Sequence, residues 1–598
     1  MRFAMLLFLS FLSASFAHGT TWFVAPDGMG DYPTIQSAID AASAGDIIEL
    51  GNGVFLGDGN RDVDFLGKAV TVRSQGGDPG LCAIDCQGSA AEPHRGFVFE
   101  SGEGAASVLE GVTIRNGYAD FPAGLFQVTD SGGGIQCYQS SPTIRGCVFE
   151  ENEAANDGGG LECRQASPTI EGCMFRDNSA GDEGGAVALV DHSTATMSGC
   201  LFSGNTAYSS GGGIVFWNSN SHVSDCTILG NHSTAGGGGI YVWNSNSHVS
   251  DCMILGNRST AGGGGIYVWD GAPEFLDCVI DSNEADGIGG GIACVQQSTP
   301  LIEGCSLANN VAHGRGGGIG CDGSSAIVAG CTFRGNHTDE DGGAFSAEAC
   351  TPTISDCLME GNDCVDEGGA IVLVSNANAS ISGCEILENV ASSSGGGIVC
   401  WNSDPAISDC DIRANESVEA GGGIYGWEAD PTLQGCLIRD NRTGGSGGGV
   451  CMDENSASTI IGCTLARNGA ADGGGVAGIN SNPVLESTII ALGVEGGAVF
   501  EGGAGVVVLS CSDLFGNGGG DWTGGIADQL GVNGNFSENP LFCDIAGGDF
   551  TVATSSPCLA GNHPDGADCG LIGAFGEGCG DPTSTQETSW GGVKRLFR

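Results

Sequence analysis

The sequence predicts an all-β protein folded as a right-handed parallel β-helix, a solenoid with three strands per coil. Three observations support this prediction. A repeat of 26 or 27 residues runs through most of the chain, each repeat holds three short apolar stretches, and Gly accounts for 109 of 598 residues. A leucine-rich repeat has a similar length but needs Leu-based spacing and often a helical half. Gly, Asn and Ser, which separate the apolar stretches, are poor helix formers, so coils of strands are favoured.

Three columns of residues define the repeat. One column is a cysteine with an asparagine five positions later, as in Cys226 and Asn231. A second is an apolar residue that follows Gly-Gly-Gly or Gly-Gly-Ala, as in Ile240, and a third precedes the cysteine, as in Pro-Thr-Ile at 352–354. We expect the apolar residues to stack inward and the glycines to form turns that need positive φ or close backbone approach. The asparagines are expected to occupy left-handed turns and to form amide ladders.

The thirteen cysteines of the first column have two possible states. Stacked coils bring their Cα atoms to about 4.8 Å, inside the disulfide window, but parallel side chains keep their Cβ atoms farther apart than the usual disulfide distance. We therefore favour buried thiols that act as small apolar residues. The column comprises Cys147, Cys173, Cys200, Cys226, Cys252, Cys278, Cys305, Cys331, Cys357, Cys384, Cys410, Cys436 and Cys463.

The repeat divides the chain into five segments. Residues 1–17 read as a secretory signal peptide, and residues 18–130 as an N-terminal cap with the first coils. A cap helix is expected in YPTIQSAIDAASAGD, where Ile35, Ala38, Ile39 and Ala42 share one face before Gly45. The remaining segments are the regular repeats at 131–500, last coils and an irregular C-terminal cap at 501–580 and a tail at 581–598. Disulfides are expected to staple the cap among Cys543, Cys558, Cys569 and Cys579.

Charge and hydropathy restrict the partners. The formal net charge of -53 disfavours nucleic acid and anionic lipid. After the signal peptide, no apolar run approaches the roughly 20 residues of a membrane-spanning helix. We therefore expect a secreted or cell-surface protein without a transmembrane segment in the mature chain.

The repeat motifs resemble those of known families. The pairing of GGAV at 184–187 with FEEN at 149–152 is similar to the GGA[ILV] and FxxN repeats of polymorphic outer-membrane proteins. More broadly, the chain resembles the pectate-lyase-like right-handed β-helix superfamily, both in its opening segment at 32–48 and in its closing segment from 539. The resemblance implies the fold, whereas activity has to be argued from a site.

Enzymes of this superfamily include lyases and hydrolases that act on acidic polysaccharides, but the sequence offers little of their chemistry. Lyases commonly use an Arg or Lys as the base in an acidic, often calcium-loaded cleft. The chain has only Lys68 and Lys594, and its arginines are scattered. Of the polygalacturonase motifs, only a fragment at 313–315, His-Gly-Arg, is present. No catalytic residue is predicted, and a polysaccharide lyase or hydrolase remains the alternative function.

Acidic loops after the asparagine column could share Ca²⁺ between coils, although a solvated acidic edge is the favoured explanation. No cofactor is required by the sequence. The candidate metal ligands are Asp182, Glu183, Asp339, Glu340, Asp341, Asp366 and Glu367.

Strand phase gives the main prediction of a binding surface. If Ile240 points inward, Tyr241 and Trp243 point outward, and the following coil repeats the arrangement. An exposed aromatic stripe usually marks a contact surface, although stacked rings can also stabilise neighbouring strands or lie under a loop. We expect a non-catalytic protein that binds an extracellular polysaccharide or a cell-surface component through Trp217, Tyr241, Trp243, Tyr267, Trp269, Trp401, Tyr425 and Trp427.

Overall fold

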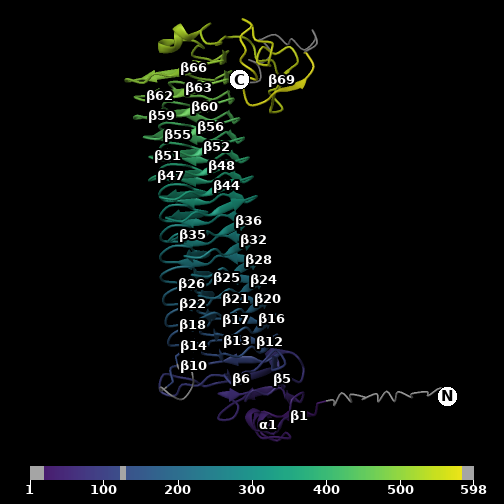
Figure 1. Cartoon of the computed structure of the whole chain (residues 1–598). Coiled ribbons are helices and arrows are strands. Elements are labelled where there is room, and N and C mark those ends of the chain that lie inside the picture. The colour runs from purple at the N-terminus through teal and green to yellow at the C-terminus, as the bar shows by residue number, and fades with distance from the viewer. Residues whose placement is uncertain (1–18, 122–129, 582–598) are drawn as a thin grey trace, which may run out of the picture.

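The computed structural model describes residues 19–121 and 130–581, which form one long stack of parallel coils with a cap at each end (Figure 1). The signal peptide predicted at residues 1–17 lies outside the described residues, as does nearly all of the tail. The parallel β-helix expected from the repeat is confirmed. Each strand pairs in parallel with the equivalent strand of the neighbouring coil, as β27 (Ile240–Trp243) does with β31 (Ile266–Trp269).

Three main sheets run along the solenoid, as predicted, and a short fourth sheet accompanies them. Sheet A extends from β1 (Thr21–Val24) to β66 (Val508–Ser510), and sheet B from β3 (Gly53–Phe55) to β67 (Asp513–Phe515). Sheet C extends from β4 (Val63–Asp64) to β65 (Val499–Gly502). Sheet D contains 13 two-residue strands, from β10 (Tyr118–Ala119) to β58 (Arg442–Thr443). Two-residue strands of small and polar residues carry no apolar alternation, which is why the repeat pattern does not indicate them.

One coil shows the path of the chain. It runs through β27 in sheet C, β28 (His248–Ser250) in sheet A, β29 (Met253–Leu255) in sheet B and β30 (Arg258–Ser259) in sheet D. The apolar residues of the first three strands fill the interior, and Ile240, Val242, Val249 and Ile254 are fully buried. The chain then returns to sheet C through a Gly triplet.

The asparagine column forms the amide ladder that the spacing predicted. The side chain of Asn257 donates to Ile228 O at 2.9 Å and to the Asn283 Oδ1 atom at 3.0 Å, and its backbone N–H donates to the same Oδ1 at 2.9 Å. Each ladder asparagine is fully buried or nearly so. The expected left-handed conformation, however, belongs to the preceding residue, Gly256, whose φ is 57°. The asparagine itself turns its side chain inward along the axis.

Two positions of the Gly triplet have distinct physical reasons. Gly237 adopts a φ of 63°, which favours glycine. Gly238 instead lies so close to its neighbours that a Cβ atom would be 2.5 Å from both Arg258 O and Gly264 O. The third position tolerates alanine in other coils, as at Ala186 and Ala370. The triplet therefore lets the return segment lie directly against sheet D.

All thirteen cysteines of the repeat column are free and buried. Each thiol lies near the carbonyl oxygen two residues earlier, with Cys252 Sγ 3.1 Å from Ser250 O. Disulfides occur in the C-terminal cap, where Cys543 pairs with Cys579 and Cys511 pairs with Cys569. The expectation that Cys558 helps to staple the cap is wrong, because this residue is a buried free thiol that contacts the Asp513 Oδ2 atom at 3.4 Å.

The N-terminal cap contains the predicted helix, α1 (Ile35–Ala41), which covers the first coil (Figure 1). Thr34 is its N-cap and accepts a hydrogen bond from the Ser37 backbone N–H. The face expected to be apolar is buried, with Ile35, Ala38 and Ile39 fully covered. The C-terminal cap folds back onto sheet B, where Phe550 packs against Leu437 and Ala466.

The close approach at the middle glycine gives a stability prediction. We expect Gly238→Ala to lower the free energy of unfolding by more than about 2 kcal/mol, because the new methyl group overlaps two backbone carbonyls. The comparison variant is Gly239→Ala, at the position where other coils carry alanine. Its Cβ atom would meet one carbonyl oxygen at 2.8 Å instead of two at 2.5 Å, so a smaller loss is expected. Urea unfolding followed by circular dichroism compares the two, and equal midpoints would contradict this account of the triplet.

Candidate functional site

The outward face of sheet C carries the aromatic residues singled out in the sequence. In β27 and its equivalents in sheet C, the first and third side chains point into the coil, and the second and fourth point away from it. In β27 and β31 these outward residues are Tyr241 with Trp243 and Tyr267 with Trp269, and each lies in register with its equivalent in the next coil. The Tyr241 and Tyr267 rings stack with centroids 5.6 Å apart. The aromatic column therefore exists, but its exposure differs from the expectation.

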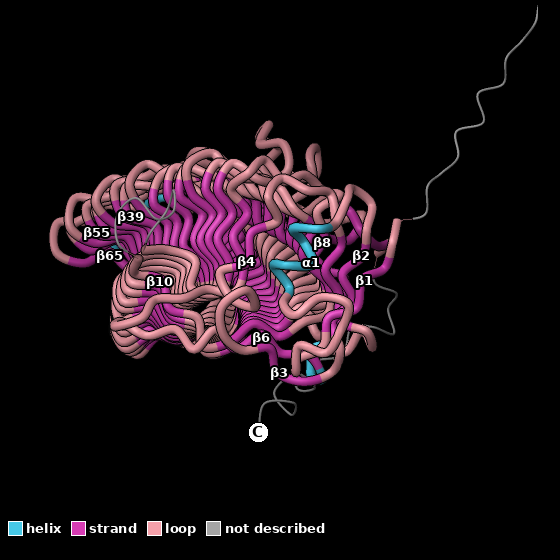
Figure 2. The backbone as a smooth tube through the Cα atoms, turned by 90° about the horizontal axis from the view of Figure 1, so that it is seen from below, coloured by secondary structure: helices cyan, strands magenta, loops and turns pink. Residues whose placement is uncertain are grey.

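The turns between sheet D and the Gly triplet cover part of the outward face of sheet C. They lie over the first outward side chain of each strand. Viewed along the axis, sheet D and its turns project as a lobe, which carries the label of its first strand, β10 (Figure 2). The lobe lies beside sheet C, where β39, β55 and β65 are labelled. The residue before each triplet lies against sheet C, and a Cβ atom on Gly262 would be 3.0 Å from the Tyr267 ring. The first outward position is therefore sandwiched between two layers of backbone.

This cover corrects the prediction that all eight aromatic side chains are exposed. Tyr241 and Tyr425 are only 8% and 5% exposed. The tryptophans at the outer position are half-buried, except Trp269, which is 39% exposed. Sequence phase identifies which side of the sheet a residue faces, but a turn that folds over that side leaves no periodic signal.

The aromatic residues form two groups along the solenoid. The N-terminal aromatic cluster consists of Trp217, Tyr241, Trp243, Tyr267 and Trp269, and it packs with Val190 and Val215. The C-terminal aromatic cluster consists of Trp401, Tyr425 and Trp427, and the two indoles stack with ring centroids 5.2 Å apart. Both clusters present indole edges and faces at the outer rim of sheet C.

The acidic residues predicted as metal ligands divide into two sets. Asp182, Asp339, Glu340 and Asp366 are exposed on the turns. Glu183, Asp341 and Glu367 directly precede a Gly triplet, and their pKa values are raised, foremost by burial. Among the described residues, one group of three potential ligands has its ligand atoms within 4.8 Å of one another, and none of these seven belongs to it. Calcium binding by the acidic loops stays a prediction.

Two buried carboxyl groups adjoin the aromatic clusters. Burial, with the nearby Asp157 and Asp182 carboxylates, raises the pKa of Glu183 to about 9. Burial likewise raises the pKa of Glu367 to about 7, although Trp401 Nε1 donates a hydrogen bond to this carboxylate. Glu183 directly precedes Gly184, and a Cβ atom on Gly184 would be 2.8 Å from the Val215 side chain that packs with the N-terminal aromatic cluster. With a pKa of about 9, the Glu183 carboxyl group is largely protonated at neutral pH.

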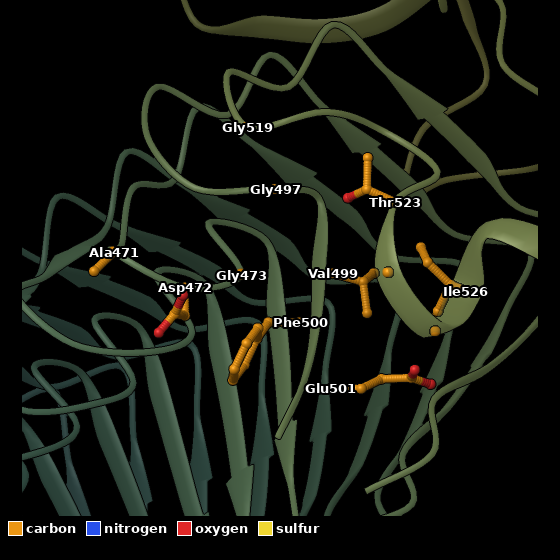
Figure 3. A pocket seen from close by; sticks show the side chains of 12 residues that line it. Ala471, Asp472, Gly473, Gly497, Val499, Phe500, Glu501, Gly519, Thr523 and Ile526 are labelled. Carbon is orange, nitrogen blue, oxygen red and sulfur yellow. The ribbon is translucent and has the colours of Figure 1, made fainter. Parts of the chain in front are cut away.

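A cavity of about 210 Å³ lies where sheet C ends at β65. Asp472 and Phe500 line one side, and Thr523 and Ile526 line another (Figure 3). Glu501 also lines it, but its Oε1 atom accepts a hydrogen bond from the Val507 backbone N–H at 2.7 Å. Sequence analysis did not find this cavity, because the repeat fades at Val499 and η2 (Gly524–Gln529), which contributes to its wall, carries no motif.

The His-Gly-Arg fragment at 313–315 does not form a catalytic pair. The Nδ1 atom of His313 lies 2.6 Å from the Asp339 Oδ2 atom on the outside of the lobe. Arg315 instead forms an ion pair with Glu348 of β43 (Phe345–Glu348) in sheet C, at 2.5 Å. His313 and Arg315 therefore form separate ion pairs, one on the outside of the lobe and one at sheet C.

The geometry defines a β-helix protein: parallel coils, three main sheets and an interior filled by stacked apolar residues. A family model described as "Right handed beta helix region" matches the chain at residues 52–228, 133–307, 289–437 and 369–537. The chain belongs to this family, in agreement with the superfamily resemblance of its motifs. Membership establishes the fold and leaves the activity open.

Solved structures with similar folds include polysaccharide lyases and a phage protein. A mannuronic acid specific family 6 polysaccharide lyase from human gut microbiota is 10% identical, with 78% of this chain and 86% of the lyase covered and a TM-score of 0.28. The PL6 family alginate lyase AlyGC is 10% identical, with 82% and 100% covered and a TM-score of 0.21. The Siphovirus 9NA tailspike receptor binding domain is 12% identical, with 80% and 74% covered and a TM-score of 0.13.

TM-scores this low support no inference about activity. No curated protein sequence matches the chain. Within the described residues, no helix is long and apolar enough to cross a membrane.

The buried Glu183 carboxyl group predicts a pH-dependent stability. Its pKa is about 9 in the folded chain but near 4.3 when unfolded, so the stability it contributes is present below about pH 4 and is lost as the pH rises towards 9. Glu183→Gln mimics the protonated form and removes this loss. We expect the variant to have a higher melting temperature than the wild type at pH 8 and the same one at pH 4.

An exposed carboxylate on another part of the solenoid supplies the control for this experiment. Asp225→Asn removes a charge that does not act on Glu183, so its melting temperature should follow that of the wild type at both pH values. A Glu183→Gln chain that is less stable than the wild type at pH 8 would show that the ionised carboxylate is the stabilising form.

Proposed function

We propose that this chain is a non-catalytic β-helix protein of the cell exterior that binds an extracellular polysaccharide through the N-terminal aromatic cluster. The observation that carries the proposal is the row formed by Trp217, Trp243 and Trp269, which occupy the same outer position in three successive coils. Indole rings pack against the apolar faces of sugar rings, and rings fixed on a sheet lose little freedom on binding. The signal peptide predicted from the sequence agrees with an exterior location.

Charge narrows the class of glycan. The net charge of -53 repels polyuronates and other polyanions, so a neutral polysaccharide is the favoured ligand. Binding by ring stacking should also depend weakly on salt, because ionic contacts would contribute little. The half-buried state of the indoles suits this role, since neighbouring side chains hold each ring while part of it stays exposed to a ligand.

A second candidate function is a polysaccharide-active enzyme, the alternative that the superfamily resemblance implies. One observation favours it: Glu183, a carboxyl group with a pKa of about 9, precedes the glycine that lies against Val215 beside the N-terminal aromatic cluster. The Asp157 carboxyl group, whose pKa burial raises to about 6, is close to Glu183. A protonated carboxylic acid next to a sugar-binding surface is the arrangement expected for general acid catalysis. Glu183 is only 8% exposed, however, which favours the binding role.

Glycan binding is tested with an array of neutral and acidic polysaccharides. We expect the wild-type chain to bind a neutral glycan and the double variant Trp243→Ala/Trp269→Ala to bind at least about ten-fold more weakly, because stacking is worth about 1–3 kcal/mol per ring. The matched control is Leu229→Ala/Met253→Ala, which removes side chains 44% and 45% exposed on sheet B of neighbouring coils. Equal losses in both variants would contradict the proposal.

Catalysis is tested on the same glycans. We expect no release of reducing or unsaturated ends above background. Turnover that is abolished in Glu183→Gln while binding is retained would establish the enzyme instead.

A further inference from the structure

The outer edge of sheet D carries acidic and basic side chains on successive coils. Arg258 of β30 lies opposite Glu284 of β34 (Glu284–Ala285), and His337 of β42 (His337–Thr338) lies opposite Asp363 of β46 (Asp363–Cys364). Asp286 follows β34 in the same coil. This edge is separate from the sheet C surface of the proposed function, and a role for it does not depend on glycan binding.

Three side chains on this edge converge. Glu284, Asp286 and His313 have ligand atoms within 4.8 Å of one another. The Nε2 atom of His313 lies 3.4 Å from the Glu284 Oε1 atom, and its Nδ1 atom lies 2.6 Å from the Asp339 Oδ2 atom. One ring nitrogen is therefore in a short hydrogen bond with the Asp339 carboxylate, while the other lies at a longer distance from the Glu284 carboxylate.

The distance from His313 to Asp339 is that of a hydrogen bond, whereas the distance from His313 to Glu284 is that of two ligands of one metal ion. A charge-assisted hydrogen bond is about 2.7–2.9 Å long, so 3.4 Å is long for a proton shared between imidazole and carboxylate. Two ligands at about 2.1 Å from a tetrahedral zinc ion lie about 3.4 Å apart. Metal-binding histidines also commonly donate their other N–H to a carboxylate, which is the position that Asp339 occupies. We propose that Glu284, Asp286 and His313 bind a divalent transition metal of the zinc class, with Asp339 as a positioning residue.

The donor atoms of these three side chains indicate which metal ion the site would prefer. An imidazole nitrogen with carboxylate oxygens suits zinc and its neighbours, whereas calcium prefers six to eight oxygen ligands. Four carboxylates lie close together on this part of the edge, from Glu284, Asp286, Asp339 and Asp363, and Arg258 is the arginine that pairs with the first two of them. A divalent ion therefore reduces an excess of negative charge.

Arg258 is the competitor for this site. Its guanidinium lies 2.7 Å from Glu284 Oε1 and 3.1 Å from Asp286 Oδ1. The side chain is 48% exposed, and an exposed ion pair contributes only about 0–1 kcal/mol, so a metal can displace it at small cost. The nearly identical preceding coil carries His232 at this position, opposite Arg258 in the sheet. The fold of the coil therefore does not require an arginine at this position.

The test titrates Zn²⁺ into the chelator-treated mature chain by isothermal titration calorimetry. We expect binding near one equivalent, loss of that binding in His313→Ala and Glu284→Gln, and a weakening of about ten-fold in Asp339→Asn. Arg258→Gln should strengthen binding, because it removes the competing cation. Circular dichroism checks folding, which should be retained because His313 and Glu284 are 42% and 38% exposed.

The matched control is His248→Ala, another exposed histidine, whose Nδ1 atom lies 3.0 Å from the single carboxylate of Glu274. It should leave Zn²⁺ binding unchanged. The proposal is overturned if His313→Ala binds Zn²⁺ as tightly as the wild type, if Arg258→Gln binds it more weakly, or if Ca²⁺ competes equally well.

Discussion

The closed hydrogen bonding of each coil onto the next is the constraint on which the whole structure depends. In the asparagine ladder a single side chain, such as Asn257, bonds the coil below through Ile228 O and the coil above through Asn283 Oδ1. A buried amide left without these partners would be costly, so every coil must place its asparagine at the same height and angle. That requirement fixes the path of the chain and thereby the register of all four sheets.

The same constraint explains why the outward face of sheet C is partly covered. Because the second glycine of the triplet allows backbone contact between sheet D and the return segment, the turn between them has little freedom and folds onto the adjacent strand. The first outward side chain of a strand, such as Tyr241, is buried in a small apolar cluster between sheet C and the turns. The second outward side chain, such as Trp269, stays more exposed. Carboxyl groups in this layer, including Glu183, are buried as a consequence of the turn geometry.

Sequence patterns predicted the coil repeat, the cap helix, the amide ladder and the side of the sheet that each aromatic residue faces, because all of these repeat with the coil. They did not predict the burial of Tyr425 or the position of the left-handed residue, since both depend on how a turn folds in three dimensions. The convergence of Glu284, Asp286 and His313 was also missed. Residues 286 and 313 come from different coils and belong to no column, so only stacking brings them together.

The near-identical coils at 218–243 and 244–269 stack in register, with Trp217, Trp243 and Trp269 in one row. A solenoid grows in whole steps of about 4.8 Å, so gain or loss of such a unit changes its length without disturbing either end. The number of copies therefore sets the length of the N-terminal aromatic cluster, because each copy adds one tyrosine and one tryptophan to it. Unequal recombination within the repeated DNA would then tune the span of the molecule in discrete increments, while each coil kept its own fold.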